Sequence, residues 1–314
     1  MQNERKEEDM KKLALVAVII FGVSVVIGFV LLGSEETVVS HEKSVAATIF
    51  PIFDIVQNVA GDEVDVVLIL PPGASPHTYE PTPATLVMIQ RSEVAYAVGH
   101  GLDDWVDGLL SNAGTEKMVV DDNVPLHVRE EEDESEEEEH GHGHEHGDID
   151  PHYWLDMLNG MAIARTVAGD LSARFPDSAA VFDRNLDVYL TRLRETHTSL
   201  LETLKPVEGR GLVTIHDAWG YFAEAYGMHV VGTFEPSPGR EPAPQYLATL
   251  IQAVQEAGSR TLFTEPQVST GSLDAFLSDN NLAIAILDPL GGEPGRDSYV
   301  ELMLHNASVV AQAL

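Results

Sequence analysis

Residues 45–70, VAATIFPIFDIVQNVAGDEVDVVLIL, predict a strand, a helix and a second strand. The helix would begin at Pro51, whose ring favours the first helical turn, and would end at Gly61, which readily adopts the backbone found after a helix. A helix between two strands is typical of a parallel sheet. This stretch therefore predicts an α/β lobe.

The alternation of strand and helix continues along most of the chain. Further strands are expected at 93–98 and 117–120, and further helices at 83–92, 102–112, 155–175 and 177–204. The helix at 177–204 would be about 40 Å long, and a second alternating set follows it. We expect two parallel-sheet α/β lobes joined by one long rigid helix. The domains would be residues 1–44 (cytoplasmic N-terminus, anchor and tether), 45–176, 177–204 and 205–314.

The composition excludes several classes of protein and of site. The formal net charge of −33 opposes binding to nucleic acids and to anionic lipids, because like charges repel. The chain has no cysteine, which excludes disulfides, thiolate metal ligands and lipid attachment through cysteine. A transition-metal site would therefore have to use histidine, aspartate, glutamate and water.

Residues 13–32, LALVAVIIFGVSVVIGFVLL, are uncharged and apolar enough to cross a membrane. A helix of that length spans about 30 Å, the thickness of a bilayer core. Basic residues precede it at Arg5, Lys6, Lys11 and Lys12. The positive-inside bias then places the N-terminus in the cytoplasm and the rest of the chain outside. We expect an uncleaved anchor, and a cleaved signal peptide is the alternative.

Potential metal ligands stand just beyond predicted strands or at the start of a helix. They are His77, His152, His216 and Asp288. Ligand sites in parallel sheets form at the carboxyl ends of the strands, and two of the four residues fall in each predicted lobe. Three imidazoles and a carboxylate suit tetrahedral zinc. Each residue could also be an ordinary loop or capping residue, so position alone leaves both readings open.

Six short motifs resemble one protein family when they are taken together and in order. They are GASPHTYEPTP, VGHGLDDWVD, DPHYWLDM, HDAWGYFAEAYG, FTEPQ and LDPLGG, which lie between residues 73 and 292. In this order they resemble the zinc and manganese solute-binding proteins of ABC importers (ZnuA/TroA-like, cluster A-I). The resemblance covers residues 45–314, and it implies two α/β lobes, a connecting helix and a metal site in the cleft between the lobes.

The resemblance also implies roles for particular residues. His77, His152, His216 and Asp288 match the metal-ligand positions of the family. His216 favours zinc, because relatives that bind manganese tend to carry glutamate there, and Mn²⁺ is the alternative. Met157 replaces the proline that ends the family's DPHxWLDP motif, so the turn there could differ.

A segment of unusual composition precedes His152. Nine of the ten residues 130–139 are acidic, and histidines alternate with other residues just after them, at His140, His142, His144 and His146. We expect a disordered loop over residues 129–149, whose histidines could bind metal as accessory ligands. A solvated loop that only keeps the protein soluble is the alternative.

The expected protein is an extracytoplasmic binding protein and not an enzyme. It would be a monomer on the outer face of the cell membrane, or periplasmic if the signal is cleaved, and it would deliver Zn²⁺ to an ABC permease and its ATPase. A zinc hydrolase is a second possibility, because three histidines and an open position can be catalytic. The chain lacks the HExxH motif of many such enzymes. A metal-binding surface adhesin is a third possibility.

Overall fold

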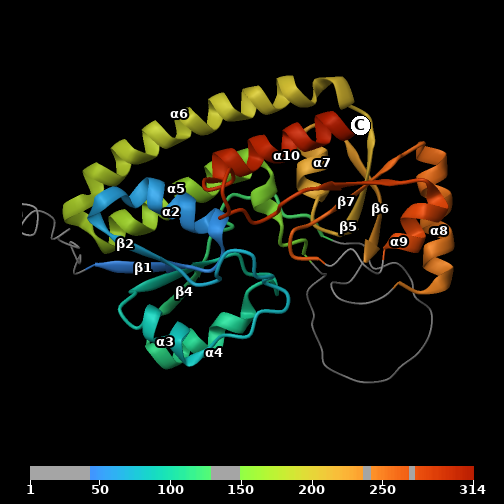
Figure 1. The fold of residues 1–314 in the computed structure, drawn as a ribbon. Helices are drawn as coiled ribbons and strands as arrows, with labels where there is room; N and C mark the ends of the chain where they lie inside the picture. Colours follow the sequence, from blue (N-terminus) through green and yellow to red (C-terminus); the bar gives the residue numbers. More distant parts are fainter. Residues whose placement is uncertain (1–42, 129–148, 236–241, 269–272) are drawn as a thin grey trace, which may run out of the picture. The chain divides into compact units, whose positions relative to one another are not determined.

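The computed structural model describes residues 43–128, 149–235, 242–268 and 273–314. Within residues His41–Leu314, which form one compact unit, the described strands build two four-stranded sheets (Figure 1). The strand orders are β2-β1-β3-β4 and β6-β5-β7-β8, and every strand pair is parallel. The prediction of two parallel-sheet α/β lobes is therefore confirmed.

The N-terminal lobe contains β1 (Ser44–Ala47), α2 (Phe50–Ala60), β2 (Asp65–Leu68), α3 (Pro83–Ile89), β3 (Val94–Ala97), α4 (Asp107–Ala113) and β4 (Glu116–Val119). Two helices follow, α5 (Met157–Arg174) and α6 (Ala179–Leu204). The C-terminal lobe contains β5 (Gly211–His216), α7 (Gly220–Ala225), β6 (His229–Glu235), α8 (Pro244–Ala257), β7 (Thr261–Thr264), α9 (Asp274–Asn280) and β8 (Ala283–Ile286). The last helix is α10 (Tyr299–Ala313).

The two inner strands of the first sheet, β1 and β3, are buried on both faces. Along β1, Val45 and Ala47 lie in the largest apolar cluster, whereas Ala46 lies in a smaller cluster with residues of α3 and α4. Alternate side chains of a strand point to opposite faces, so this division shows an apolar layer on each side. Such burial explains why β1 and β3 carry apolar residues on both faces instead of alternating with polar residues.

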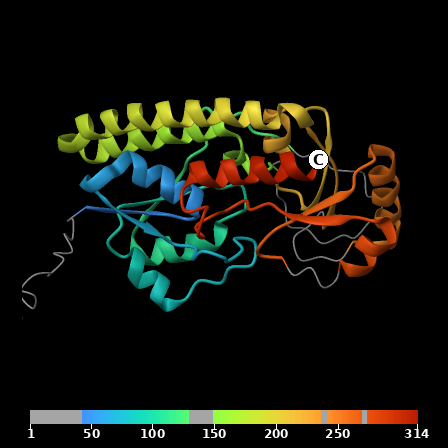
Figure 2. The ribbon, with the colours of Figure 1, turned by 45° about the horizontal axis from the view of Figure 1, so that its top comes forward.

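Two helices connect the lobes along one side. Helix α6 contacts α2 and α5, and α10 at the end of the chain also contacts α6 and α2 (Figures 1 and 2). The largest apolar cluster contains side chains of both lobes and of these helices, including Leu193 of α6, Phe222 of α7 and Met303 of α10. The long helix is therefore part of a continuous core and is not a free linker.

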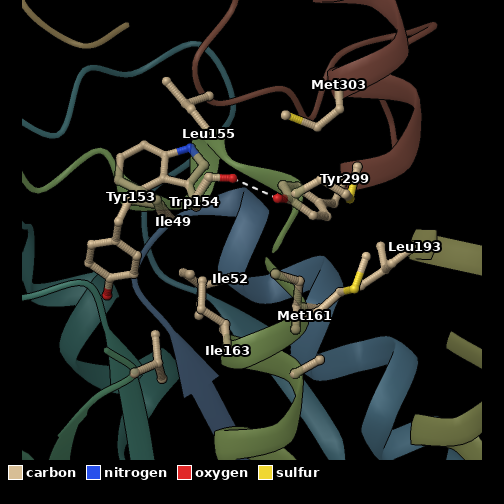
Figure 3. Close-up of a cluster of buried hydrophobic side chains, with 14 of the residues drawn as sticks. Ile49, Ile52, Tyr153, Trp154, Leu155, Met161, Ile163, Leu193, Tyr299 and Met303 are labelled. Carbon is tan, nitrogen blue, oxygen red and sulfur yellow. Dashed lines mark hydrogen bonds between the residues drawn. The ribbon is translucent and has the colours of Figure 1, made fainter. Parts of the chain in front are cut away.

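Tyr299 at the start of α10 links this helix to the rest of the core through hydrogen bonds (Figure 3). Its hydroxyl donates a hydrogen bond of 2.6 Å to the Trp154 carbonyl, and its backbone N–H donates one of 3.0 Å to Asp54 Oδ2. Burial raises the pKa of Asp54, and the hydrogen bond from Tyr299 opposes that rise. A Cβ atom at Gly160 would collide with the Tyr299 hydroxyl, so α5 needs glycine at this point.

Some predicted segments lie outside the described residues. These are the membrane anchor at residues 13–32 and the four accessory histidines His140, His142, His144 and His146. Across the parts of the chain that the structure does describe, no helix has both the length and the apolar character needed to cross a bilayer.

We expect Tyr299→Phe to destabilise the fold without changing its apolar packing. The substitution removes the donor to the buried Trp154 carbonyl, which should lower the free energy of unfolding by about 1–3 kcal/mol. Urea titration followed by circular dichroism measures this change. Thr198→Ala is the control, because Thr198 is exposed and bonds only the carbonyl one turn earlier in its own helix. Equal stability of Tyr299→Phe and the wild type would show that this hydrogen bond does not fasten α10.

Candidate metal centre

His152 is held by the carboxylate of Asp150, two residues earlier. Asp150 Oδ1 accepts hydrogen bonds from the His152 backbone N–H (3.0 Å) and from its ring Nδ1 (2.8 Å). Because a carboxylate can only accept, Nδ1 carries the proton and Nε2 is left with its lone pair. Burial lowers the pKa of His152, and the adjacent Asp150 opposes this. The ring therefore presents a neutral nitrogen, the form that binds a metal ion.

His216 has the same arrangement on the other lobe. It is the last residue of β5, and its Nδ1 lies 2.7 Å from Glu265 Oε1. The Trp219 indole N–H donates to the same oxygen at 3.1 Å. Glu265 directly follows β7, the strand that pairs with β5, so the parallel sheet places both residues at one edge. Nε2 of His216 is then also left as an acceptor.

The two Nε2 atoms lie 3.3 Å apart. In a tetrahedral zinc site with Zn–N distances of about 2.0–2.1 Å, neighbouring ligand nitrogens lie roughly 3.3–3.4 Å apart. Two imidazole lone pairs at this separation repel each other, so a cation or a shared proton between the rings would stabilise the pair. The pair has the spacing of two ligands on one zinc ion.

His77 completes a group of three imidazoles. It lies in the loop after β2, and its ring centroid is 5.6 Å from that of His152 and 5.2 Å from that of His216. One potential ligand atom from each of the three lies within 4.8 Å of the others. His152 and His216 are buried whereas His77 is exposed, so solvent reaches the group at His77.

Asp288, the fourth residue predicted from the sequence, is not a member of this group. Its Oδ2 lies 2.8 Å from Arg296 Nε, and its Oδ1 accepts hydrogen bonds from the N–H groups of Leu290 and Gly291, each at 3.0 Å. The carboxylate is thus already paired with a cation and two amides. Its role as a fourth ligand stays a prediction.

The sequence pattern did not indicate the two carboxylates that bind the ring Nδ1 atoms of His152 and His216. Glu265 follows a strand as His216 does, so the same positional argument could have found it. Asp150 stands two residues before His152, a spacing suited to bonding the next backbone N–H. Asp217 does not stand at the N-cap of the next helix, because Trp219 has that position in α7. The backbone turns first, with the Ala218 N–H bonded to the His216 carbonyl at 3.0 Å.

The ends of the acidic, histidine-rich segment come together close to the site. Val128 and Ile149 form an antiparallel bridge, and the Asp150 N–H donates to the His127 carbonyl at 2.9 Å. Tyr221 of α7 accepts a hydrogen bond from the His127 N–H and donates one to the Asp150 carbonyl. Residues 128 and 149 therefore meet just before Asp150, the residue that holds His152.

We expect the carboxylate of Glu265 to be necessary for tight metal binding. Glu265→Ala leaves His216 without the acceptor that fixes its tautomer and ring orientation, which should weaken Zn²⁺ binding by roughly 10–100-fold. Isothermal calorimetry measures the loss. Glu256→Ala, at an exposed glutamate of α8, is the matched control and should bind as the wild type does. Unchanged affinity of Glu265→Ala would show that the contact does not orient a ligand.

Comparison with known proteins agrees with a metal-binding role. The profile of the family "Zinc-uptake complex component A periplasmic" (ZnuA) matches residues 45–313. The manganese-binding lipoprotein MntA of Halalkalibacterium halodurans is 30% identical over 90% of this chain and 93% of its own length. The manganese ABC transporter substrate-binding lipoprotein PsaA of Streptococcus pneumoniae is 28% identical over 97% of this chain and 99% of its own length.

A solved structure shows the same architecture. A crystal structure of ZnuA has a TM-score of 0.75 and 26% identity, and the match covers 86% of this chain and 98% of that one. The family profile spans both lobes and all three clustered histidines. The chain therefore belongs to the ZnuA family of metal-binding solute-binding proteins of ABC importers.

Proposed function

We propose that this protein binds Zn²⁺ outside the cytoplasm and delivers it to an ABC importer, with His77, His152 and His216 as the ligands. The observation that carries the proposal is the convergence of three imidazoles, two of them with Nε2 atoms 3.3 Å apart and with carboxylates behind them. Imidazole nitrogens suit zinc, and zinc readily accepts the tetrahedral arrangement that this spacing fits. The role is capture and release of a cargo ion, without catalysis.

Manganese is the second candidate, because two similar relatives are named for it. Mn²⁺ favours carboxylate and water oxygens over imidazole nitrogens. The clustered residues of this chain supply three nitrogens, and the nearby carboxylates of Asp150 and Glu265 bind ring N–H groups. This donor set supports zinc over manganese.

The position of this site suggests a role for each part of the chain. We propose that residues 45–176 and 205–314 act as the two metal-holding lobes and residues 177–204 as the connecting helix. His77 and His152 come from the first part and His216 from the second. The metal would therefore bridge the two lobes. The permease would recognise the metal-bound form through contacts with the surfaces of the lobes.

We further propose that the N-terminal segment attaches the protein to the membrane through residues 13–32. The relatives MntA and PsaA are named as lipoproteins, whereas this chain contains no cysteine to carry a lipid. Its uncharged stretch is long enough to span a bilayer as a helix. The binding protein would then remain beside the permease and the ATPase that complete the importer.

The histidines at 140, 142, 144 and 146 would serve as accessory ligands. The described residues at the two ends of their segment, Val128 and Ile149, form a bridge next to Asp150, which binds His152. Histidines that alternate with glycine and glutamate in the sequence should lose chain entropy when they bind a metal, so we expect their affinity to be below that of the group of His77, His152 and His216.

We expect the triple variant His77→Ala, His152→Ala and His216→Ala to lose tight zinc binding. The triple variant removes every member of the clustered group, so calorimetry on a chain that also lacks residues 130–147 should detect no high-affinity Zn²⁺ site. Competition with Mn²⁺ on the parent chain should show a preference for Zn²⁺.

Two further variants serve as controls for the triple variant. Deleting residues 130–147 alone should remove weaker zinc equivalents and leave one tight site. His197→Ala combined with His229→Ala removes histidines that stand apart from the clustered group and should leave that site intact. Tight zinc binding by the triple variant would refute the ligand assignment, and a preference for Mn²⁺ would favour the second candidate.

A further inference from the structure

Asp288 is almost completely buried, and both of its carboxylate oxygens have partners. Its side chain is 1% exposed, and that of Arg296 is 20% exposed. Oδ1 accepts the N–H groups of Leu290 and Gly291, and Oδ2 faces Arg296 Nε at 2.8 Å. The Nε N–H is not aligned for a hydrogen bond, so the contact with Oδ2 is an ion pair. A buried carboxylate that lost this cation would be left uncompensated.

A tight turn holds Arg296 over Asp288. The Gly292 N–H bonds to the Arg296 carbonyl at 2.9 Å, and the Arg296 N–H bonds to the Glu293 carbonyl at 2.8 Å. Gly291 has φ of +74°, and a Cβ atom there would lie 2.9 Å from the Arg296 carbonyl oxygen. Glycine is therefore required for the backbone to return so closely. The local backbone therefore brings the main chain of Arg296 back toward the loop that carries Asp288.

This turn lies beside the metal-binding group. The Trp154 indole N–H donates to the Pro289 carbonyl at 2.8 Å, and the Trp154 ring is 5.3 Å from that of His152. A Cβ atom at Gly292 would lie 3.1 Å from the Phe50 ring, so the loop also packs against the N-terminal lobe. Asp288 is thus in the neighbourhood of the site while standing outside the group of convergent ligand atoms.

We propose that Arg296 is a specificity-determining residue that keeps the carboxylate of Asp288 away from the bound metal. The inference rests on the proposed function, in which His77, His152 and His216 bind the ion. A free carboxylate would add the oxygen donor that Mn²⁺ favours, whereas a withheld one leaves the imidazole set that suits Zn²⁺. Arg296 makes no contact with the metal and acts by occupying Oδ2.

Arg296→Met should release the carboxylate and shift the metal preference. In the full chain we expect Mn²⁺ affinity to rise by about 10–100-fold, the size of effect that residues behind metal ligands have. Adding Asp288→Asn to Arg296→Met should cancel this gain, because no carboxylate is then released. Direct calorimetry with Mn²⁺ and Zn²⁺ measures both changes. An unchanged Mn²⁺ to Zn²⁺ ratio in Arg296→Met would overturn the proposal.

Asp288→Asn alone tests the same claim by removing the buried negative charge while keeping the size of the side chain. The amide oxygen can still accept from Leu290 and Gly291, so the turn should persist. Zn²⁺ affinity should stay within about 3-fold of the wild type, well below the roughly 10–100-fold losses typical of metal-site residues. A loss of about 100-fold or more would identify Asp288 as a ligand and overturn the proposal even if Arg296→Met does not fold.

Visible absorption of the Co²⁺-loaded proteins supplies a readout of the ligand set itself. The spectrum of Asp288→Asn should match the wild type, and that of Arg296→Met should differ because a carboxylate joins the metal. Identical spectra for wild type and Arg296→Met would contradict the proposal. Failure of the proposed function looks different: the wild type and His216→Ala would then bind Zn²⁺ equally weakly, whatever stands at position 288.

Discussion

The group of clustered histidines depends on two buried carboxylates that hold two imidazoles with their Nε2 atoms toward each other. Asp150 and Glu265 each accept a ring Nδ1–H, which leaves the Nε2 atoms of His152 and His216 as acceptors 3.3 Å apart. Without a cation or a proton between them this arrangement is repulsive. One ring comes from the segment before α5 and the other from the end of β5, so a bound ion would offset this repulsion across the two lobes.

The apolar core around the site helps to fix the positions of the His152 and His216 rings. Helix α6 and the terminal helix α10 share one apolar core with parts of both lobes. Tyr299 joins α10 to Trp154, and Trp154 is only two residues from His152. The packing that stabilises the fold therefore also positions a ligand. The third imidazole, His77, comes from an exposed loop and gives the site its contact with solvent.

Much of this organisation could be predicted from the sequence because it is local. The alternation of strand and helix indicated two α/β lobes, and the position of His216 at a strand end indicated its place at the sheet edge. The common strand order of the two sheets could not be predicted, because it appears in the pairing of distant strands and not as a sequence repeat. The contact of Glu265 with His216 depends on that pairing. The ion pair of Asp288 with Arg296 depends on a glycine turn whose geometry is not visible in the sequence pattern.

The central claim is that three imidazoles of this chain share one zinc ion. X-ray absorption at the zinc edge tests it directly on the full chain loaded with one equivalent of Zn²⁺. We expect three imidazole nitrogens at about 2.0–2.1 Å, with the outer-shell scattering that imidazole rings produce. Glu265→Ala should disturb that pattern more than Glu256→Ala does. A spectrum with one imidazole or none, and oxygen donors in their place, would contradict the account.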